Sequence, residues 1–303
     1  MAISRAQLAK ELEPGLNALF GLEYGRYENE HSEIFDEESS DRAFEEEVML
    51  GGFSTAPSKG EGTAISFDEA RETYTARYTH ETIALAFSIT EEAIEDNLYD
   101  RLASRYTKAL ARSMAQTKQI KAAAILNNAF LAGANAIGDG VALCSNAHPS
   151  LSGNQTNLLA TAADLNETSL EQMLIDIAGL TDERGLKIAV RGTKLVIPKE
   201  LQFIAERVLN SNLRSGTADN DNNAMKNMGM LPEGAVVNHF LTDTDAYFIK
   251  TDAPNGFKYF NRAAIKTAME GDFDTGNMRF KARERYSFGV SDWRSVFGTP
   301  GAA

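Results

Sequence analysis

The sequence contains few of the residues that build disulfides, metal centres and membrane spans. It has one cysteine, Cys144, and four histidines in 303 residues. A single cysteine cannot form an intrachain disulfide or a zinc knuckle, and no two histidines stand at the HxxxH spacing of a metal site. No window approaches the ~18 uninterrupted apolar residues of a membrane-spanning helix, and the first residues lack the apolar run of a signal peptide. We therefore expect a soluble protein kept in a reducing compartment.

Positive charge is also scarce. The chain has 30 lysines and arginines against 43 aspartates and glutamates, a net charge of -13. Binding to nucleic acid through a basic surface needs cations that displace counterions from phosphates, so this balance argues against it, and against docking on an anionic membrane. A local basic patch is still compatible with the average. The hydrophobic fraction of 43% is ordinary for a globular chain that forms one large domain or two smaller ones.

Motifs that bind phosphates or metals are incomplete. Gly138-Asp139-Gly140 lacks the third glycine of a dinucleotide-binding loop and follows a predicted helix instead of a strand. Asp219, Asp221 and Asn223 match the first positions of a calcium-binding loop, but its sixth and twelfth positions are not the required glycine and glutamate. A solvated loop is the better interpretation. We predict no cofactor-binding residue and no metal ligand.

Nucleophilic residues give one hypothesis. Cys144 and His148 are four residues apart, which would allow a Cys–His dyad, although a buried thiol beside a turn explains the same residues. The sequence has no G-x-S-x-G elbow, and its acidic pairs occur in runs such as 45–47 that normally form a solvated surface. We predict no catalytic residue and a protein that is not an enzyme.

Hydrophobic periodicity predicts an α+β protein. Apolar residues that recur every four positions after a capping box at Ser88-Ile89-Thr90-Glu91 predict one helix of about 40 residues. An acid-rich arm at 28–47 contains a single cation, Arg42. The other predicted elements are a helix at 4–13 stopped by Pro14-Gly15, a long hairpin with extended segments at 48–53, 63–67, 74–80 and 83–89, a helix at 168–184 ended by Gly185, a strand at 194–197, a helix that begins at Pro198, a mobile loop at 210–229, and strands at 236–241, 247–250 and 278–290.

Groups of residues spread over nearly the whole chain resemble one family. They are Pro14-Gly15-Leu16 with Phe20-Gly21-Leu22-Glu23-Tyr24, Lys59-Gly60-Glu61-Gly62 with Ile65-Ser66-Phe67-Asp68, Arg77-Tyr78-Thr79-His80, Phe87-Ser88-Ile89-Thr90-Glu91-Glu92 with Glu95-Asp96-Asn97-Leu98-Tyr99, Gly138-Asp139-Gly140 with Ala147-His148-Pro149 and Gly153-Asn154, and Asp292-Trp293-Arg294 with Phe297-Gly298. In this order and spacing the chain resembles the major capsid proteins of tailed bacteriophages, which have the Hong Kong 97-type capsid fold. Among them it is most similar to the Mu-like major head subunit family.

The resemblance implies a division of the chain. It consists of an N-terminal arm at 1–47, an extended β-hairpin loop at 48–87, the spine helix and the start of the connection between peripheral and axial domains at 88–165, an axial domain at 166–246, and the C-terminal β part of the peripheral domain at 247–303. The extended loop would lie over a neighbouring subunit. The inter-subunit contacts implied at its tip are Pro57, Lys59, Gly60, Glu61 and Gly62.

The implied function is that of a major capsid protein that self-assembles into hexamers and pentamers of an icosahedral shell around double-stranded DNA, without sequence-specific binding. The implied partners are other copies of the chain, a scaffold protein, a portal and decoration proteins, with no membrane. The implied location is the virion capsid, after assembly in the host cytoplasm. Some proteins of this fold join subunits through Lys–Asn isopeptide bonds, and Lys59 stands where such a lysine could lie, although a solvated lysine is the simpler interpretation.

Three alternatives stay open from the sequence. The first is an encapsulin-like nanocompartment shell of the same fold around an enzyme cargo. The second is a hydrolase that uses Cys144 and His148. The third is a tail or portal protein that forms rings or tubes instead of closed shells. Nuclease-resistant DNA inside purified particles would separate the phage shell from the nanocompartment.

Overall fold

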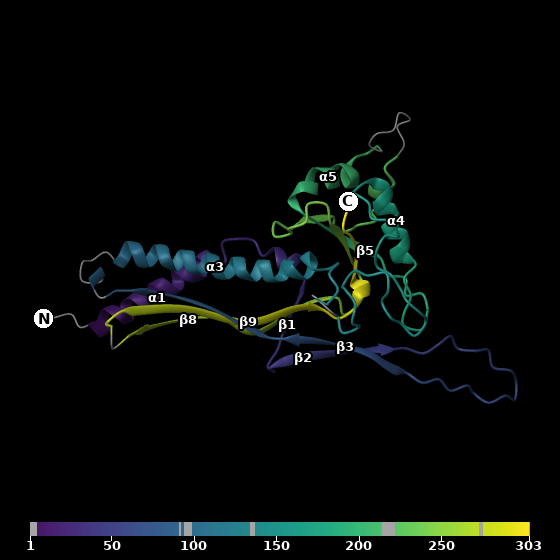
Figure 1. Ribbon diagram of the computed structural model, residues 1–303, viewed down its shortest axis with the longest axis horizontal. Helices are drawn as coiled ribbons and strands as arrows, with labels where there is room; N and C mark the ends of the chain where they lie inside the picture. Colours follow the sequence, from purple (N-terminus) through teal and green to yellow (C-terminus); the bar gives the residue numbers. More distant parts are fainter. Residues whose placement is uncertain are drawn as a thin grey trace.

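The computed structural model describes residues 5–90, 92–93, 99–133, 137–213, 222–272 and 275–302 of the chain. Figure 1 shows a long body in which helices lie along a sheet, a lobe at one end of that body, and a hairpin that extends away from both. Helices and strands are thus mixed along the chain, which confirms the predicted α+β class.

The body is a four-stranded sheet with two helices on one face. The strand order is β1–β8–β9–β4, in which β8, β9 and β4 are antiparallel and β1 pairs in parallel with β8. Side chains of both helices and of the sheet share one hydrophobic cluster, which holds them together. The elements of the body are α1 (Arg5–Tyr24), β1 (Asp36–Ser39), β4 (Glu81–Ile89), α3 (Tyr99–Asn127), β8 (Phe257–Gly271) and β9 (Met278–Val290).

Helix α1 continues through Pro14 and Gly15, so the prediction that it stops there is wrong. Proline inside a helix removes a backbone hydrogen bond and costs about 3 kcal/mol. Leu16 and Phe20 follow the proline and are buried in the cluster shared with α3 and β9. Their burial contributes about 1.5–3 kcal/mol for each side chain, which offsets the cost.

The N-cap and the C-terminal end predicted for helix α3 differ from those in the structure. Ser88 lies in strand β4 and is not the predicted N-cap, whereas the hydroxyl of Thr90 accepts a hydrogen bond from the amide of Ala93 at 3.4 Å. The helix ends at Asn127, after 29 residues, because the Asn127 side chain and the Ala129 carbonyl bond to other segments of the chain. Residues 94–98 lie outside the described part, so the predicted length of about 40 residues is not tested at its start.

The lobe is built on a second sheet, with strand order β10–β7–β5–β6. Trp293 and Phe297, near the C-terminus, are buried in the same core as this sheet and the end of α3, so lobe and body share one core. The elements of the lobe are α4 (Glu167–Ala178), β5 (Gly192–Ile197), η2 (Lys199–Leu201), α5 (Gln202–Asn210), α6 (Ala224–Met228), β6 (Ala235–Val237), β7 (Tyr247–Thr251), η3 (Trp293–Ser295) and β10 (Val296–Thr299).

Helix α4 begins where the sequence predicts and ends earlier. Asn166 is its N-cap, in a capping box with Ser169. The helix stops at Ala178 instead of residue 184, because the amide of Gly179 bonds to the carbonyls of the last turn and residues 180–187 then fold back on themselves. Pro198 precedes the short 3-10 helix η2 and does not begin an α-helix, a second correction in this lobe.

The acid-rich segment 28–47 contacts both the body and the lobe. It forms the 3-10 helix η1 (Glu30–Glu33), strand β1 and the start of the next strand. Its carboxylates form ion pairs with lysines of three other strands. The pairs are Lys194–Glu33 at 2.8 Å, Lys250–Asp36 at 3.5 Å, Lys258–Glu38 at 3.0 Å and Lys258–Glu47. Much of the negative charge of this segment is therefore paired within the chain.

Strand β8, the longest strand at 15 residues, was not predicted. Its register against β9 shifts between Asn261 and Ala263, and again between Ala263 and Lys266. Each irregularity inserts an unpaired residue and changes which side chains face the core. The alternation of apolar and polar residues that marks a regular strand is lost there.

Candidate functional site

The extended loop is formed by residues 52–70, between strands β2 (Phe44–Gly51) and β3 (Arg71–Thr79). The two strands pair in an antiparallel ladder, and every residue from 52 to 70 is exposed. Figure 1 shows the loop extending beyond both the body and the lobe. The predicted segment 83–89 does not belong to this hairpin, because it forms β4 in the body sheet. The hairpin is therefore shorter in sequence than predicted, and its strand β2 begins earlier.

The tip of the loop turns at Gly60–Thr63. The amide and the hydroxyl of Thr63 both donate to the Gly60 carbonyl, at 3.2 and 2.8 Å, and Gly62 has φ 79°, a conformation that favours glycine. The strand predicted at 63–67 is not formed, and Pro57 in the opposite limb has no amide hydrogen to donate to a ladder. The predicted contact residues all lie in this exposed loop: Pro57, Lys59, Gly60, Glu61 and Gly62.

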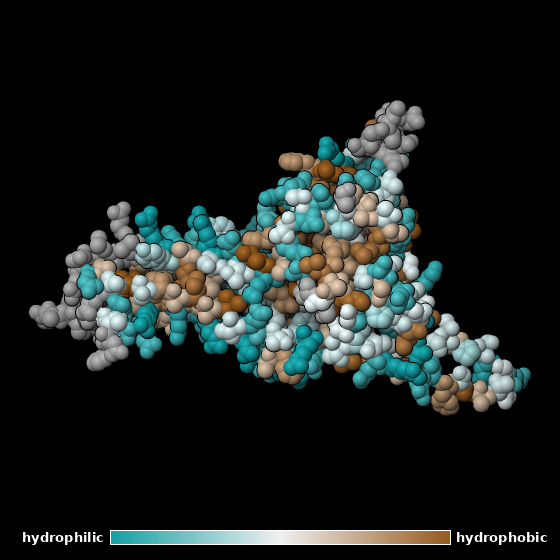
Figure 2. Space-filling view, in the orientation of Figure 1, coloured by the Kyte–Doolittle hydropathy of each residue, from teal (hydrophilic) through white to brown (hydrophobic). Residues whose placement is uncertain are grey.

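The loop also carries large apolar side chains into solvent. Phe53, Ile65 and Phe67 are 60%, 69% and 96% exposed. Figure 2 shows hydrophobic residues on this projecting part of the surface. Exposed apolar groups that gather on one segment mark a surface that a partner can bury.

A hydrogen-bonded pair closes the base of the loop. The Asp68 carboxylate accepts from the amide of Ser54 at 2.7 Å and from its hydroxyl at 2.6 Å. These bonds, together with one from the Glu69 amide, lower the pKa of Asp68 to about 2, because they favour the ionised form. The pair links the two limbs across 14 residues of sequence, so it fixes the direction in which the loop leaves the hairpin.

Arg184 attaches the loop base to the lobe. Its guanidinium donates to the carbonyls of Gly52 at 3.2 Å and Glu69 at 2.5 Å, one on each limb, and lies 3.8 Å from the Asp68 carboxylate. A planar guanidinium can bridge two carbonyls because its donors form a rigid fork. Arg184 therefore holds both limbs together against the turn at 181–186.

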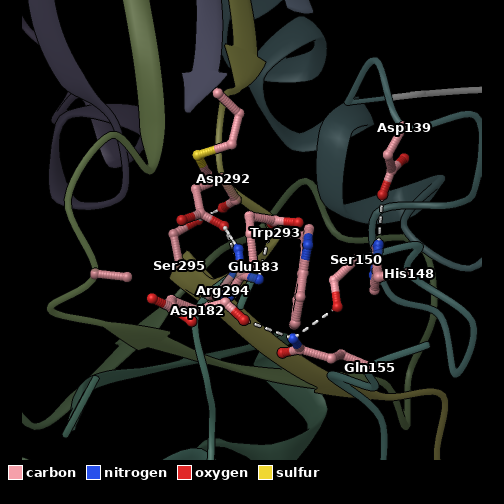
Figure 3. Close-up of polar contacts among 12 residues, drawn as sticks. Asp139, His148, Ser150, Gln155, Asp182, Glu183, Asp292, Trp293, Arg294 and Ser295 are labelled. Carbon is pink, nitrogen blue, oxygen red and sulfur yellow. Dashed lines mark hydrogen bonds and ion pairs between the residues drawn. The ribbon is translucent and has the colours of Figure 1, made fainter. Parts of the chain in front are cut away.

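The C-terminal segment fixes this turn in place. Arg294, which is 2% exposed, forms an ion pair with Glu183 at 2.9 Å and donates from Nε to the Thr181 carbonyl at 2.7 Å. Asp292 is a second carboxylate, 3.3 Å from Arg294, and burial raises its pKa. Figure 3 shows these side chains converging beside Asp182 and Gln155. The position of the loop base thus depends on a buried ion-pair network.

Trp293 is the centre of this network. Its ring stacks on the His148 ring, with centroids 4.4 Å apart and planes inclined by 5°, and the Arg294 guanidinium lies 4.3 Å from its centroid. Figure 3 shows the Trp293 ring between the other two groups. His148 Nδ1 lies 2.6 Å from the Asp139 carboxylate and Nε2 lies 3.1 Å from Asn157 Oδ1. Trp293 therefore joins the segment after α3 to the turn that holds the loop.

The Cys–His dyad is not formed. Both ring nitrogens of His148 are bonded to Asp139 and Asn157. Cys144 is buried at 2% exposure, and burial raises the pKa of its thiol, which keeps it protonated at neutral pH. The simpler interpretation, a buried thiol next to a turn, agrees with this geometry.

The other candidate sites give no chemistry in the described part of the chain. Asp219 and Asp221 lie outside the described residues, and Asn223 caps α6 by accepting from the Lys226 amide at 3.3 Å. The described residues include no group of three or more histidine, cysteine or acidic side chains placed to hold a metal ion. None of the described helices combines the length and apolar character needed to cross a membrane.

The sequence patterns did not identify the residues that hold the loop base. Arg184 is more than a hundred residues from its carbonyl acceptors, and Arg294 is 111 residues from Glu183. No local spacing signals such contacts. The resemblance did select Asp68 and the segment Asp292-Trp293-Arg294 as family-like residues, but it assigned them no role.

Comparison with known proteins gives a family match over most of the chain. A family model described as phage capsid protein matches residues 73–298, from within β3 to within β10. The chain belongs to this phage capsid protein family. It is therefore a structural protein that contributes to a capsid shell. A search of the curated proteins finds no match.

Solved capsid structures share the fold at low sequence identity. The procapsid protein of bacteriophage JBD30 is 13% identical, covers 99% of this chain and 77% of its own length, and has a TM-score of 0.54. The capsid protein of Myoviridae phage XM1 is 14% identical, with 89% of each chain covered and a TM-score of 0.53. A virus-like particle protein from Pyrococcus furiosus is 9% identical, with 94% and 97% covered and a TM-score of 0.51. The likeness to all three is one of fold.

Proposed function

We propose that this phage capsid protein is the major head subunit of a tailed bacteriophage, of the Mu-like family. Copies of the chain assemble in the host cytoplasm into hexamers and pentamers of an icosahedral shell around double-stranded DNA. A scaffold protein, a portal and decoration proteins complete the head. The observation that carries the proposal is the extended loop, which is exposed over its whole length. Arg184 holds its base, and the buried Arg294–Glu183 pair fixes the turn that carries Arg184.

The loop fits a role between subunits. A loop that served only its own chain would bury its apolar side chains, whereas Ile65 and Phe67 are exposed. A neighbouring copy is the natural cover, because an assembly of identical chains supplies the same complementary surface to every loop. The tip residues Pro57, Lys59, Gly60, Glu61 and Gly62 are then the inter-subunit contacts.

The division into parts follows the same proposal. The arm is 1–47, the extended loop 48–87, the spine helix and connection 88–165, the axial domain 166–246 and the C-terminal β part of the peripheral domain 247–303. The lobe elements α4, α5 and β5 lie within the proposed axial domain, whereas β7 and β10 of the same lobe lie in the proposed C-terminal part. The core around Trp293 joins the lobe to the body. Arms and loops outside the core of their own chain are suited to exchange contacts between subunits.

A nanocompartment shell is the second candidate. The virus-like particle protein from Pyrococcus furiosus is covered over 97% of its length, so the fold alone suits such a container equally well. The net charge of -13 is also compatible with either content. The family match favours the phage head.

Purification of the protein from cells, followed by nuclease treatment, tests the proposal. Closed shells of uniform size in negative-stain micrographs, formed by the chain with its scaffold, support the capsid role. Nuclease-resistant double-stranded DNA in particles from infected cells supports the phage head. Shells that hold a defined enzyme and no DNA would support the nanocompartment instead.

A further inference from the structure

The side of helix α3 that faces away from the body sheet carries a line of cations. Arg105, Lys108 and Arg112 are all exposed, and side chains three or four residues apart are neighbours on one face of a helix. On the other face, residues that include Leu110 and Met114 are buried in the cluster that α3 shares with the sheet. We name the three cations the cationic stripe of α3.

The charge of this helix is almost all of one sign. It contains six lysines and arginines and a single acid, Asp100, in a chain whose net charge is -13. Lys118 and Lys121 form ion pairs with Glu284 and Glu81 of the sheet. The stripe, in contrast, forms no ion pair among the described residues, so its charge is available to a partner.

Arg112 marks one end of the stripe. It donates a hydrogen bond to the Tyr27 hydroxyl, and its guanidinium lies 5.3 Å from the centroid of that ring. The cavity beside it is also lined by two acids, Glu28 and Glu30. Arg112 is therefore partly engaged by the arm, and the other two cations of the stripe are the more available to a partner.

The spacing of the stripe matches the backbone of a nucleic-acid duplex. An α-helix rises about 1.5 Å per residue, so Arg105 and Arg112 are separated by about 10.5 Å along its axis. Each strand of double-stranded DNA carries a phosphate about every 3.4 Å along the duplex axis, so this length faces about three phosphates. Ala109, which is exposed between Lys108 and Arg112, is short enough to let a backbone approach the cations.

Helix α3 lies on the side of the body sheet opposite the hairpin β2–β3 (Figure 1). Tyr78 of the hairpin packs on Gly289 from one side of the sheet, whereas Phe280 packs on α3 from the other. Figure 2 shows hydrophilic side chains projecting along the edge of the body where α3 lies. The hairpin thus does not cover the helix side of the subunit, and a closed shell turns one side of each subunit toward its contents.

We propose that the cationic stripe of α3 contacts the phosphate backbone of the DNA that the shell encloses. The inference rests on the proposed capsid function and identifies the surface of the chain that touches the DNA. Lysine and arginine bind phosphates through charge and the release of counterions, and these contacts carry no sequence information. The net charge of -13 does not prevent the contact, because exposed charges farther away than about 8 Å are largely screened at physiological salt. A few such contacts in each copy are weak singly, so the DNA can still leave the shell.

An acidic segment of another protein, such as a scaffold, is the other partner that a line of cations could bind. A stable protein interface has apolar or aromatic side chains at its centre. The large apolar side chains exposed in the described part of α3, Tyr106 and Ile120, lie to one side of the stripe, and the Tyr106 ring lies 5.8 Å from the ring of Phe87. DNA therefore fits the stripe better, and binding to a protein is an outcome of the test.

The opposite face of the body sheet also carries exposed cations, among them Lys281 and Arg283. This face is of mixed sign, because Glu270 of β8 lies directly opposite Arg279 of β9. The hairpin also covers one end of it, where Tyr78 packs on the sheet. A surface of uniform charge is the better match for a polyanion, so we assign the DNA to α3, and Lys281 serves as an internal control in the test.

Lysine footprinting of particles from infected cells tests the inference. Particles filled with DNA, and particles emptied by osmotic shock and nuclease treatment, are exposed to an acetylating reagent, and mass spectrometry follows each lysine. We expect Lys108 to react several-fold more slowly in filled particles than in emptied ones, because DNA covers it. Lys281, on the other face of the sheet, should react at the same rate in both.

A salt titration of the unassembled chain, with a short labelled duplex of random sequence, gives a second readout. The variant Arg105→Gln with Lys108→Gln removes two phosphate contacts. The slope of log affinity against log salt should therefore become shallower by about 1.8, at about 0.9 for each contact. Lys199→Gln with Arg207→Gln, both exposed in the lobe, is the matched control and should leave the slope unchanged. Circular dichroism and thermal unfolding confirm that each variant is folded.

Three outcomes would overturn the inference. They are equal rates for Lys108 in filled and emptied particles, protection of Lys108 only in particles that still contain scaffold, and a folded stripe variant whose salt slope equals that of the wild type. The second would assign the stripe to a protein partner. Shells that contain no DNA would instead contradict the proposed function, and the duplex titration would still decide whether the stripe binds DNA.

Discussion

Ser54 and Asp68 close the base of the extended loop through two hydrogen bonds to one carboxylate, at 2.7 and 2.6 Å. Arg184 holds the same base to the lobe, and Arg294 holds the turn that carries Arg184. A chain of polar contacts thus runs from the buried C-terminal segment to a fully exposed loop. The loop is exposed over its whole length and its base is fixed in direction, which suits a segment that must meet a neighbouring subunit.

The first prediction concerns Asp68→Asn. The amide side chain accepts more weakly than a carboxylate, so the two limbs should separate more often and residues 52–70 should be cleaved several-fold faster by a protease. Limited proteolysis followed by mass spectrometry measures this rate. Glu61→Gln, at an exposed position of the same loop, is the control and should leave the rate unchanged. Equal rates for both variants would show that the pair does not hold the loop.

Acid should open the loop base only at very low pH. The folded-state pKa of Asp68 is lowered to about 2, below its unfolded value, so its contribution is present above the unfolded pKa and is lost as the pH falls through about 2. The Ser54 amide should therefore keep its NMR chemical shift between pH 7 and pH 4. A shift of that amide that titrates near pH 4 would contradict the assignment.

The second prediction concerns the buried ion pair of Arg294. Arg294→Met removes the cation between Glu183 and Asp292, which are 2% and 6% exposed, and leaves two carboxylates in a buried site. Breaking a buried pair in this way costs about 3–5 kcal/mol. Urea unfolding of unassembled protein measures the loss. Arg207→Met, at an exposed position of α5, should change stability by less than about 0.5 kcal/mol.

Loop cleavage gives an independent readout of the role of Arg294, with a second variant. If Arg294 acts through Glu183 and Arg184 on the loop base, a folded Arg294→Lys variant should also raise the cleavage rate of residues 52–70. Lysine keeps the charge but lacks the fork that reaches both Glu183 and the Thr181 carbonyl. An unchanged cleavage rate would separate core stability from loop position.

The third prediction concerns the close packing at Gly298. A Cβ atom there would lie 2.8 Å from Phe248 Cδ1 and 2.9 Å from Cys144 Sγ, which is too close for either contact. Gly298→Ala should therefore destabilise the protein by about 1–3 kcal/mol, measured by urea unfolding. Gly271→Ala is the matched control, because a Cβ at Gly271 meets nothing within 4 Å. A Gly298 variant as stable as this control would show that the core at β10 is loose.

The fourth prediction concerns the single cysteine. Because Cys144 is buried and its pKa is raised by burial, iodoacetamide at neutral pH should label it slowly in the native protein and rapidly in urea. Mass spectrometry over a time course measures both rates. Fast labelling of folded protein would revive the Cys144–His148 hypothesis.

Local patterns in the sequence predicted some elements well. Strand β9 has the predicted bounds, 278–290, because cations and buried residues alternate strictly along most of it. Strands β5 and β7 and the start of α4 also match, where apolar runs or a capping residue define them. These signals act within a few residues of one another, so the sequence reveals them directly.

Long-range contacts explain the failures. Pro14 argues for the end of a helix, and only the burial of Leu16 and Phe20 against distant elements lets α1 continue. In β8 the irregular pairing with β9 breaks the alternation of apolar and polar residues, and the sequence of β8 alone does not reveal that pairing. The anchor at Arg184 depends on which distant segments of the chain become neighbours. The loop tip was found from the resemblance, and its role between subunits is still a prediction.

Imaging of the purified chain with its scaffold by cryo-electron microscopy tests the central claim most directly. The account predicts closed icosahedral shells in which the loop of each subunit, residues 52–70, lies over the next subunit. A protein that stays monomeric at high concentration with its scaffold present would contradict the account. Shells in which every extended loop projects into solvent without contacting another copy would contradict it equally.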